Sequence, residues 1–160
     1  MSELPNLPAN ALDDARTLLH GVVEQTLVAV GWPKERADAY PPATVRIPGA
    51  WVDVPTLSAQ GNGLVATFPI GLAVDGTDRA QVQRLDALLA ILWSRLEAVR
   101  IPEGLRLQAG STLQVMTAGP QQLDIGGPST RSIVLTVQVP ITPRTLCPSA
   151  LTNPTGDPTP

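Results

Sequence analysis

One long amphipathic segment, from Asp78 to Val99, most constrains what this chain can fold into. Leu88, Ile91 and Trp93 widen its apolar face, and the opposite face is polar. The residues at the centre of the apolar face recur every three or four positions, at Val82, Leu85, Leu89, Leu92, Leu96 and Val99. This spacing places the apolar side chains on one side of an α-helix. We therefore expect a helix about 33 Å long that crosses a small sheet and around which the rest of the chain packs.

A second helix is expected from Ala11 to Val30, because its apolar residues also keep helical spacing. Asn10 is a suitable N-cap residue, and acidic residues in the first turn favour the positive end of the helix dipole. Gly31 stands where a left-handed residue ends a helix, and Pro33 blocks continuation. The segment from Lys34 to Pro42 is interpreted as a polar connector.

Three strands are expected between the two helices. Thr44–Ile47 and Ala50–Val54 are short, with Pro48-Gly49 as a turn between them. The third alternates apolar side chains over residues 64–74, which is typical of a strand. Pro69 in this strand cannot donate a ladder hydrogen bond, so the strand is expected at an edge or bulged. Residues 56–63 are interpreted as a loop.

After the long helix, strands are expected at Leu105–Thr117, interrupted at Gly110, and at Arg131–Pro140, paired antiparallel. The whole pattern predicts an α+β fold with the order α-β-β-β-α-β-β. Two helices would pack on an antiparallel or mixed sheet of about four to five strands. Residues 1–10 are interpreted as a flexible arm, 11–140 as a single domain and 141–160 as a Pro-rich extended tail.

Composition excludes some classes of function. Apolar residues make up 43% of the 160 positions, and the net charge is −3 with scattered basic residues. Binding to nucleic acid uses clustered Lys and Arg, so this pattern argues against it. The single cysteine, Cys147, excludes an intrachain disulfide. The first ten residues lack the pattern of a signal peptide, and no apolar run reaches membrane-spanning length.

No motif predicts catalysis, a cofactor or a metal. His20 lies inside the first helix, where a surface or boundary position is expected, and Cys147 has no neighbouring base in sequence. Asp75 and Asp78 resemble part of a calcium loop, but the downstream Glu is missing and helix capping explains both. Gly61-Asn62-Gly63 precedes a strand, unlike a phosphate-binding loop. Catalytic carboxylates brought together in space stay open.

Five stretches of local sequence carry a resemblance to a known family. They are Pro42-Ala43-Thr44-Val45, Val52-Asp53-Val54-Pro55, Phe68-Pro69-Ile70, the run Val74-Asp75-Gly76-Thr77-Asp78-Arg79-Ala80, and Leu85-Asp86-Ala87-Leu88-Leu89. With the order of the expected elements, they make residues 40–139 resemble the tail terminator proteins of long-tailed, siphovirus-type phages that infect actinobacteria. The tail after Ile141 has no counterpart in this resemblance.

The resemblance implies a structural role in the virion tail or neck, after assembly in the host cytoplasm. Such proteins form a hexameric ring that caps the tail tube, ends its polymerisation and joins it to the head-side connector. The implied partners are further copies of the chain, the tail tube protein and the connector or stopper protein. DNA passes through the ring without sequence-specific binding, no membrane is involved, and the family has no catalytic residues to transfer.

Two segments, 57–63 and 118–130, are expected to make contacts between subunits or between rings. Trp93 is a further candidate, because aromatic residues often anchor interfaces. The candidate contact residues are Leu57, Gln60, Asn62, Trp93, Gln121, Gln122, Leu123, Asp124 and Ile125. Three alternatives stay open: a head–tail stopper or adaptor ring, a small enzyme or ligand-binding α+β domain, and a cytosolic oligomer of another kind.

Overall fold

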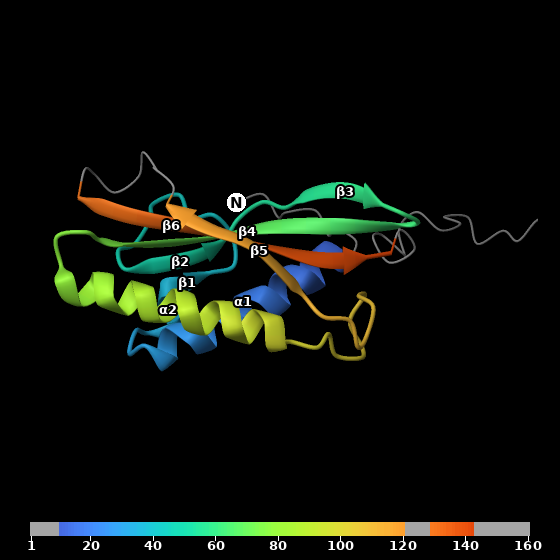
Figure 1. Cartoon of the computed structure of the whole chain (residues 1–160), viewed down its shortest axis with the longest axis horizontal. Coiled ribbons are helices and arrows are strands. Elements are labelled where there is room, and N and C mark those ends of the chain that lie inside the picture. The colour runs from blue at the N-terminus through green and yellow to red at the C-terminus, as the bar shows by residue number, and fades with distance from the viewer. Residues whose placement is uncertain (1–9, 121–128, 143–160) are drawn as a thin grey trace, which may run out of the picture.

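The computed structural model describes residues 10–120 and 129–142. Two long helices lie on one face of a six-stranded sheet (Figure 1). The elements in chain order are α1 (Ala11–Ala29), η1 (Lys34–Arg36), β1 (Ala37–Asp38), β2 (Gly49–Val52), β3 (Thr56–Gln60), β4 (Gly63–Asp75), α2 (Arg79–Ala98), β5 (Gln114–Pro120) and β6 (Thr130–Ile141). The predicted α+β class and the two helices are confirmed, and the sheet has six strands where four to five were expected.

The sheet is organised around β4, its longest strand. The strand order is β1-β2-β4-β6-β5, and only the β1–β2 pair is parallel. On one side β4 pairs with β6 along its full length. On the other side its first half pairs with β3 and its second half with β2. The predicted antiparallel pairing of the last two strands is confirmed as β5 with β6.

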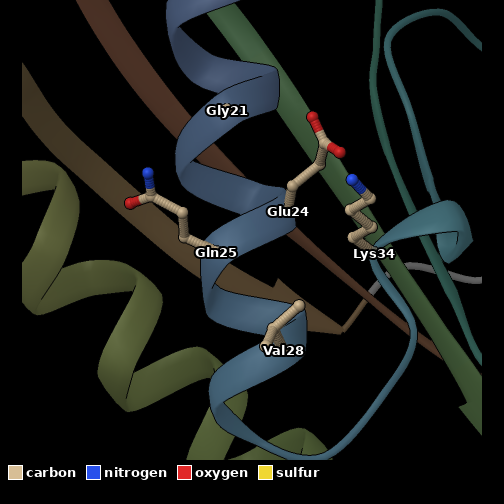
Figure 2. A pocket seen from close by; sticks show the side chains of 5 residues that line it. All are labelled: Gly21, Glu24, Gln25, Val28 and Lys34. Carbon is tan, nitrogen blue, oxygen red and sulfur yellow. The ribbon is translucent and has the colours of Figure 1, made fainter.

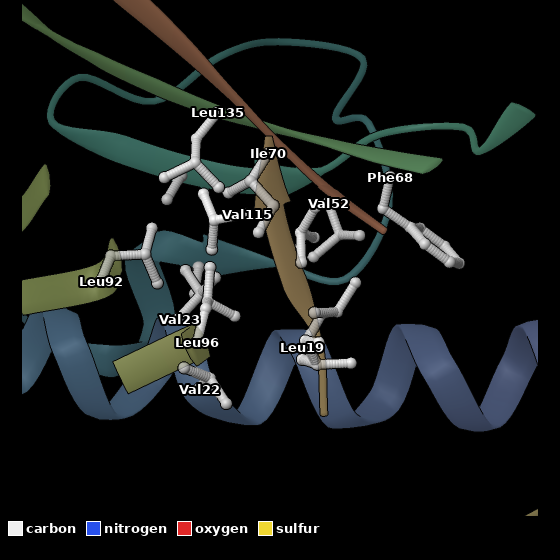
Figure 3. Packing of buried hydrophobic residues seen from close by; sticks show 14 of the residues in the cluster. Leu19, Val22, Val23, Val52, Phe68, Ile70, Leu92, Leu96, Val115 and Leu135 are labelled. Atoms are coloured by element: carbon white, nitrogen blue, oxygen red, sulfur yellow. The ribbon is translucent and has the colours of Figure 1, made fainter. Parts of the chain in front are cut away.

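The core lies between β4 and the helices, as Figure 3 shows for its central side chains. Alternate residues of β4 are fully buried and point toward the helices, namely Ala66, Phe68, Ile70, Leu72 and Val74. The buried face of α2 consists of Leu85, Leu88, Leu92 and Leu96. Val82, Leu89 and Trp93, predicted within or beside the buried stripe, are only partly buried. The helix therefore presents a narrower face than the sequence pattern predicted.

The expectation that the chain packs around α2 needs correction. The helix α1 buries eight residues against four for α2. The central strand β4 also makes more contacts than either helix, because it pairs with β2, β3 and β6. A strong amphipathic pattern marks a helix at the surface of a domain, with its polar side in water. The element around which the chain is organised is instead β4, which pairs with other strands on both of its sides.

The short strands before β4 differ from those predicted. Thr44–Ile47 is not a strand, whereas the expected polar connector contains η1 and β1. The expected loop at 56–63 is the strand β3 and the hairpin that joins it to β4. Every residue of β3 is exposed, so its sequence needs no apolar alternation and gave no strand signal.

A bulge separates β2 from β3. The partner of Val52 is Ile70, and the partner of Thr56 is Thr67, so three residues at 53–55 stand opposite the two at 68–69. The carbonyl of Pro69 accepts a hydrogen bond from the Asp53 amide at 2.8 Å. The side of Pro69 without a donor therefore faces the bulge. Of the two expectations for Pro69, the edge position is wrong and the irregular pairing is observed.

Residues 101–113 are irregular, where a strand was predicted from Leu105. Ile101, Leu107 and Leu113 are buried in this segment, and this anchoring produced the apolar pattern. The backbone turns on itself, since the amides of Ile101 and Gly110 bond to the carbonyls of Ser111 and Ile101 respectively. Gly110 has φ +80°, a left-handed conformation that is incompatible with an extended strand at this position.

The predicted helix caps at Asn10, Gly31 and Asp78 are confirmed, whereas Asp75 accepts hydrogen bonds from Thr77 in the turn before α2 and is not a helix cap. The side chain of Asn10 accepts hydrogen bonds from the amides of Leu12 and Asp13, and Gly31 has φ +85°. Asp78 accepts from the amides of Ala80 and Gln81 at the start of α2. Among the residues that the structure describes, no helix has the length and apolar character needed to cross a membrane.

Candidate assembly interface

The strand β3 forms a free edge of the sheet. It pairs with β4 through a two-residue loop, in which Gly61 has φ +62° as tight hairpins require. Gln60 and Gly63 flank this loop and face each other, so Ser58 and Thr56 also direct their backbone groups toward β4. The N–H and C=O groups of Leu57 and Ala59 therefore point outward. No other strand of the described residues pairs with this side of β3.

The strand β5 forms the opposite edge. Beyond β6 it has no further strand partner among the described residues. A register shift between Val115 and Thr117 leaves Met116 as a bulged residue, and its side chain is 43% exposed. Thr117 and Thr136 lie opposite each other, with 2.9 Å between their hydroxyl oxygens. The bulge twists this edge without adding a charge to it.

The strand β1 forms a third stretch of sheet edge, and it differs from β3 in its length and its charge. The strand has two residues, and Asp38 forms an ion pair of 3.0 Å with Arg46. A short strand flanked by charges is a common protection against unwanted strand pairing. The five residues of β3 include no charge, proline or glycine. The sheet is therefore protected at β1 and unprotected at β3.

Exposed apolar side chains gather beside the two free edges. Val54 is 64% exposed in the bulge before β3, Leu57 is 45% exposed within β3, and Met116 lies on β5. The greater part of β4, β5 and β6 is also uncharged, since residues 63–74, 114–120 and 132–141 contain no Asp, Glu, Lys or Arg. Uncharged strands with apolar side chains at the rim are suited to contact with protein.

A buried arginine fixes the position of the bulge. Arg16 on α1 is 8% exposed, and its guanidinium donates to the carbonyls of Ala39 at 2.6 Å, Val52 at 2.7 Å and Asp53 at 3.1 Å. The same group lies 4.4 Å from the centre of the Tyr40 ring. These bonds satisfy carbonyls that the interrupted strand leaves without a ladder partner. Arg16 thus ties the helix layer to the point where β2 gives way to β3.

Burial and nearby charges act on Arg16 in opposite directions. Loss of hydration lowers the pKa of its guanidinium, whereas Tyr40, Asp53 and Asp13 raise it. The side chain remains a cation because a free guanidinium titrates far above neutral pH. Sequence reasoning missed Arg16. The available signal was a single basic residue on the apolar side of the first helix, three positions before Leu19 and one after Ala15.

The structure places some of the predicted contact residues together. Leu57, Gln60 and Asn62 are all exposed on the β3–β4 hairpin. Trp93 is half-buried on α2 and packs against the core, so it does not join them. The remaining five, Gln121 to Ile125, lie outside the described residues.

The positions weighed for chemistry have structural roles in the described part of the chain. His20 on α1 lies 3.2 Å from Glu24 and 3.0 Å from the carbonyl of Ala37. Asp75 accepts two hydrogen bonds from Thr77, which lower the pKa of its carboxyl group. Cys147 lies outside the described residues. Within them, no group of three or more His, Cys, Asp or Glu is arranged to hold a metal ion.

The surface of the described residues includes two hollows of note. One of about 380 Å³ is on the outer side of α1, where Figure 2 shows the side chains around it, namely Glu24, Gln25, Val28 and Lys34, with Gly21. The other, of about 270 Å³, lies on the open face of the sheet between β3 and β5 and includes Gln60, Gln114 and Gln138. The first hollow has one acidic and one basic side chain, Glu24 and Lys34, and the residues around the second include no ionisable group.

Comparison with known proteins gives a limited result. No known protein family matches the chain, and no curated protein matches it. Among solved structures, the chain is similar to one in the "Virion of native gene transfer agent (GTA) particle", with a TM-score of 0.48 and 18% identity. The similarity covers 78% of this chain and 94% of that one. At this level of similarity it assigns neither a family nor a function.

Proposed function

We propose that the chain is a structural protein of a phage virion that forms a ring on the end of the tail tube. The ring ends polymerisation of the tube and joins it to the head-side connector. The proposal starts from the sequence resemblance to tail terminator proteins, and the observation that carries it further is the pair of sheet edges at β3 and β5 that have no strand partner among the described residues.

Three of the five stretches that carry the resemblance fall at junctions of the fold, whereas residues 85–89 lie inside α2. Residues 52–55 span the end of β2 and the bulge, and residues 68–70 lie in β4 opposite that bulge. Residues 74–80 form the turn that ends β4 and caps α2 through Asp78. These junctions fix where β2 gives way to β3 and where α2 begins. These three stretches therefore concern parts of the chain that set its architecture.

The two free edges are compatible with a ring. A contact that joins two different surfaces of the same protein leaves one surface free at one end of the growing assembly and the other surface free at the opposite end. Such a head-to-tail contact produces a closed ring when the rotation between neighbours closes, and a filament when it does not. The edges at β3 and β5 are two different surfaces on opposite sides of one sheet. The stoichiometry that the resemblance implies is six copies.

The charge of the sheet suits passage of DNA through such a ring. Affinity for duplex DNA comes largely from Lys and Arg that neutralise phosphates and release counterions. The open face of the sheet carries no basic side chain along residues 63–74, 114–120 and 132–141. A duplex that moves across this face therefore meets no strong electrostatic trap.

Electron microscopy of tails assembled with and without the protein tests the proposal. With the protein, we expect tubes of uniform length that end in a ring; without it, we expect tubes of irregular length. A protein that leaves tube ends bare and instead plugs DNA-filled heads would contradict the terminator role and support the stopper or adaptor. A deletion of Gln121–Gly127 addresses the second predicted contact segment, and normal tail length in that variant would exclude it from assembly.

A further inference from the structure

We propose that neighbouring copies of the chain join by strand pairing, with the outer edge of β3 in one copy against the outer edge of β5 in the next. The inference deepens the proposed ring and rests on it, because it names the surfaces that meet. The occupant of the β3 edge is therefore a second copy of this chain.

Strand direction permits this contact. β3 runs antiparallel to β4, β4 to β6, and β6 to β5. The two edge strands therefore run in opposite directions. When a second copy is placed beside the first in the plane of the sheet, its β5 lies antiparallel to β3, and the helices of both copies stay on the same face. Continuation of the sheet thus needs no inversion of the subunit.

The β3 edge has backbone groups available for the contact. β3 presents the N–H and C=O groups of Leu57 and Ala59, which no strand of the described residues engages. An unpaired, uncharged strand edge is a template for addition of another strand. The exposed side chain of Leu57 accompanies this edge, and that of Met116 accompanies the other. Strand pairing would give the backbone groups of Leu57 and Ala59 hydrogen-bond partners. It would also remove the side chains of Leu57 and Met116 from water.

The register of the sheet adds a constraint on the ring. Ser58 shares a row with Val65 and Pro140, whereas Thr117 shares a row with Thr136. The centres of β3 and β5 are therefore four residues apart along β6, or about 13 Å. Neighbouring copies joined edge to edge must step along the strand direction by this amount. A flat ring closes only if the strands are inclined to its axis, as in closed barrels.

Proline at Ala59 tests the contact at β3. The Ala59 N–H points away from β4, so Ala59→Pro removes an outward donor without breaking the hairpin. We expect an unchanged circular dichroism spectrum and an association constant between copies that falls roughly ten-fold or more. The matched control, Ala59→Ser, keeps the donor and should assemble like the original chain. Leu57→Lys places a charge on the same edge and serves if the proline variant does not fold.

A mixing experiment tests whether the partner edge is β5. Met116→Lys places a charge on the β5 edge, as Ala59→Pro alters the β3 edge, and each variant alone is expected to remain monomeric. A mixture of the two variants should form a heterodimer and nothing larger. The intact β3 edge of Met116→Lys would then meet the intact β5 edge of Ala59→Pro. Self-association of Met116→Lys alone would show β3 pairing with β3 and overturn the inference.

The outcomes separate this inference from the proposed function. Rings that form normally from Ala59→Pro and Leu57→Lys would refute the edge contact and leave the ring proposal standing. A wild-type chain that stays monomeric, both alone and with tail tubes, would contradict both.

Discussion

Replacement of Arg16 by methionine tests how the helix layer holds the sheet in register. Arg16→Met keeps the length and apolar stem of the side chain and removes the donors to Ala39, Val52 and Asp53. The bond to Val52 is buried and the other two are partly buried. Methionine leaves all three carbonyls without this partner at the point where β2 ends.

The expected loss follows from the burial of each carbonyl. A buried acceptor left without a partner costs about 1–3 kcal/mol, and the two carbonyls within reach of water about 0.5–1 kcal/mol each. Relief of the burial cost of the guanidinium offsets part of this sum. We expect a net loss of about 3 kcal/mol in the free energy of unfolding. In urea this corresponds to a midpoint lowered by about 1.5 M, for an m-value of about 2 kcal/mol/M.

Two comparison variants make the result interpretable. Arg84 lies exposed on α2, so Arg84→Met should change the free energy of unfolding by less than about 0.5 kcal/mol. Arg16→Lys keeps the charge but cannot span three carbonyls, so it should fall between the two methionine variants. If Arg16→Met lost no more stability than Arg84→Met, the role assigned to the buried guanidinium would be wrong.

Three further predictions concern single positions. A Cβ at Gly71 would lie 2.2 Å from the indole of Trp51, so Gly71→Ala should lower the Tm by about 6 °C for a cost of about 2 kcal/mol; Gly119→Ala, where a Cβ meets nothing within 4 Å, should leave it unchanged in calorimetry. Asp78→Ala should cost about 1 kcal/mol in urea unfolding through loss of the α2 cap, and no loss would contradict the capping role. Because its pKa is lowered in the folded state, the Asp75 carboxylate stabilises the fold at pH values above the ordinary pKa of 3.8. This stabilisation is lost as the pH falls through the lowered pKa. The stability difference from Asp75→Asn should therefore shrink in acid, and a difference independent of pH would refute the assignment.

The parts of the fold that sequence predicted well are those with local signals. Both helices, their caps at Asn10 and Asp78, and the long strands β4 and β6 follow from periodicity and capping chemistry within a few neighbouring residues. Each signal reflects a side chain that packs or bonds close to its own position in the chain. Tertiary contacts had little influence on where these elements begin and end.

The parts that sequence missed depend on distant contacts. β3 has no buried face, and only its pairing with β4 makes it a strand. Residues 101–113 carry an apolar pattern because three side chains reach the core from an irregular backbone. Arg16 bonds to carbonyls at Ala39, Val52 and Asp53, more than twenty positions further along the chain.

Of the predicted contact residues, Leu57, Gln60 and Asn62 lie together on the exposed β3–β4 hairpin, and their role in subunit contacts stays a prediction. It could not predict that β5 lies on the opposite edge, because strand order depends on the arrangement of the whole sheet.

The mass of the purified chain, measured alone and with its tail tube protein, tests the central claim most directly. The account predicts a discrete ring of six copies of the 16.8 kDa chain that binds tube ends. A chain that remains a 16.8 kDa monomer in both conditions would contradict it.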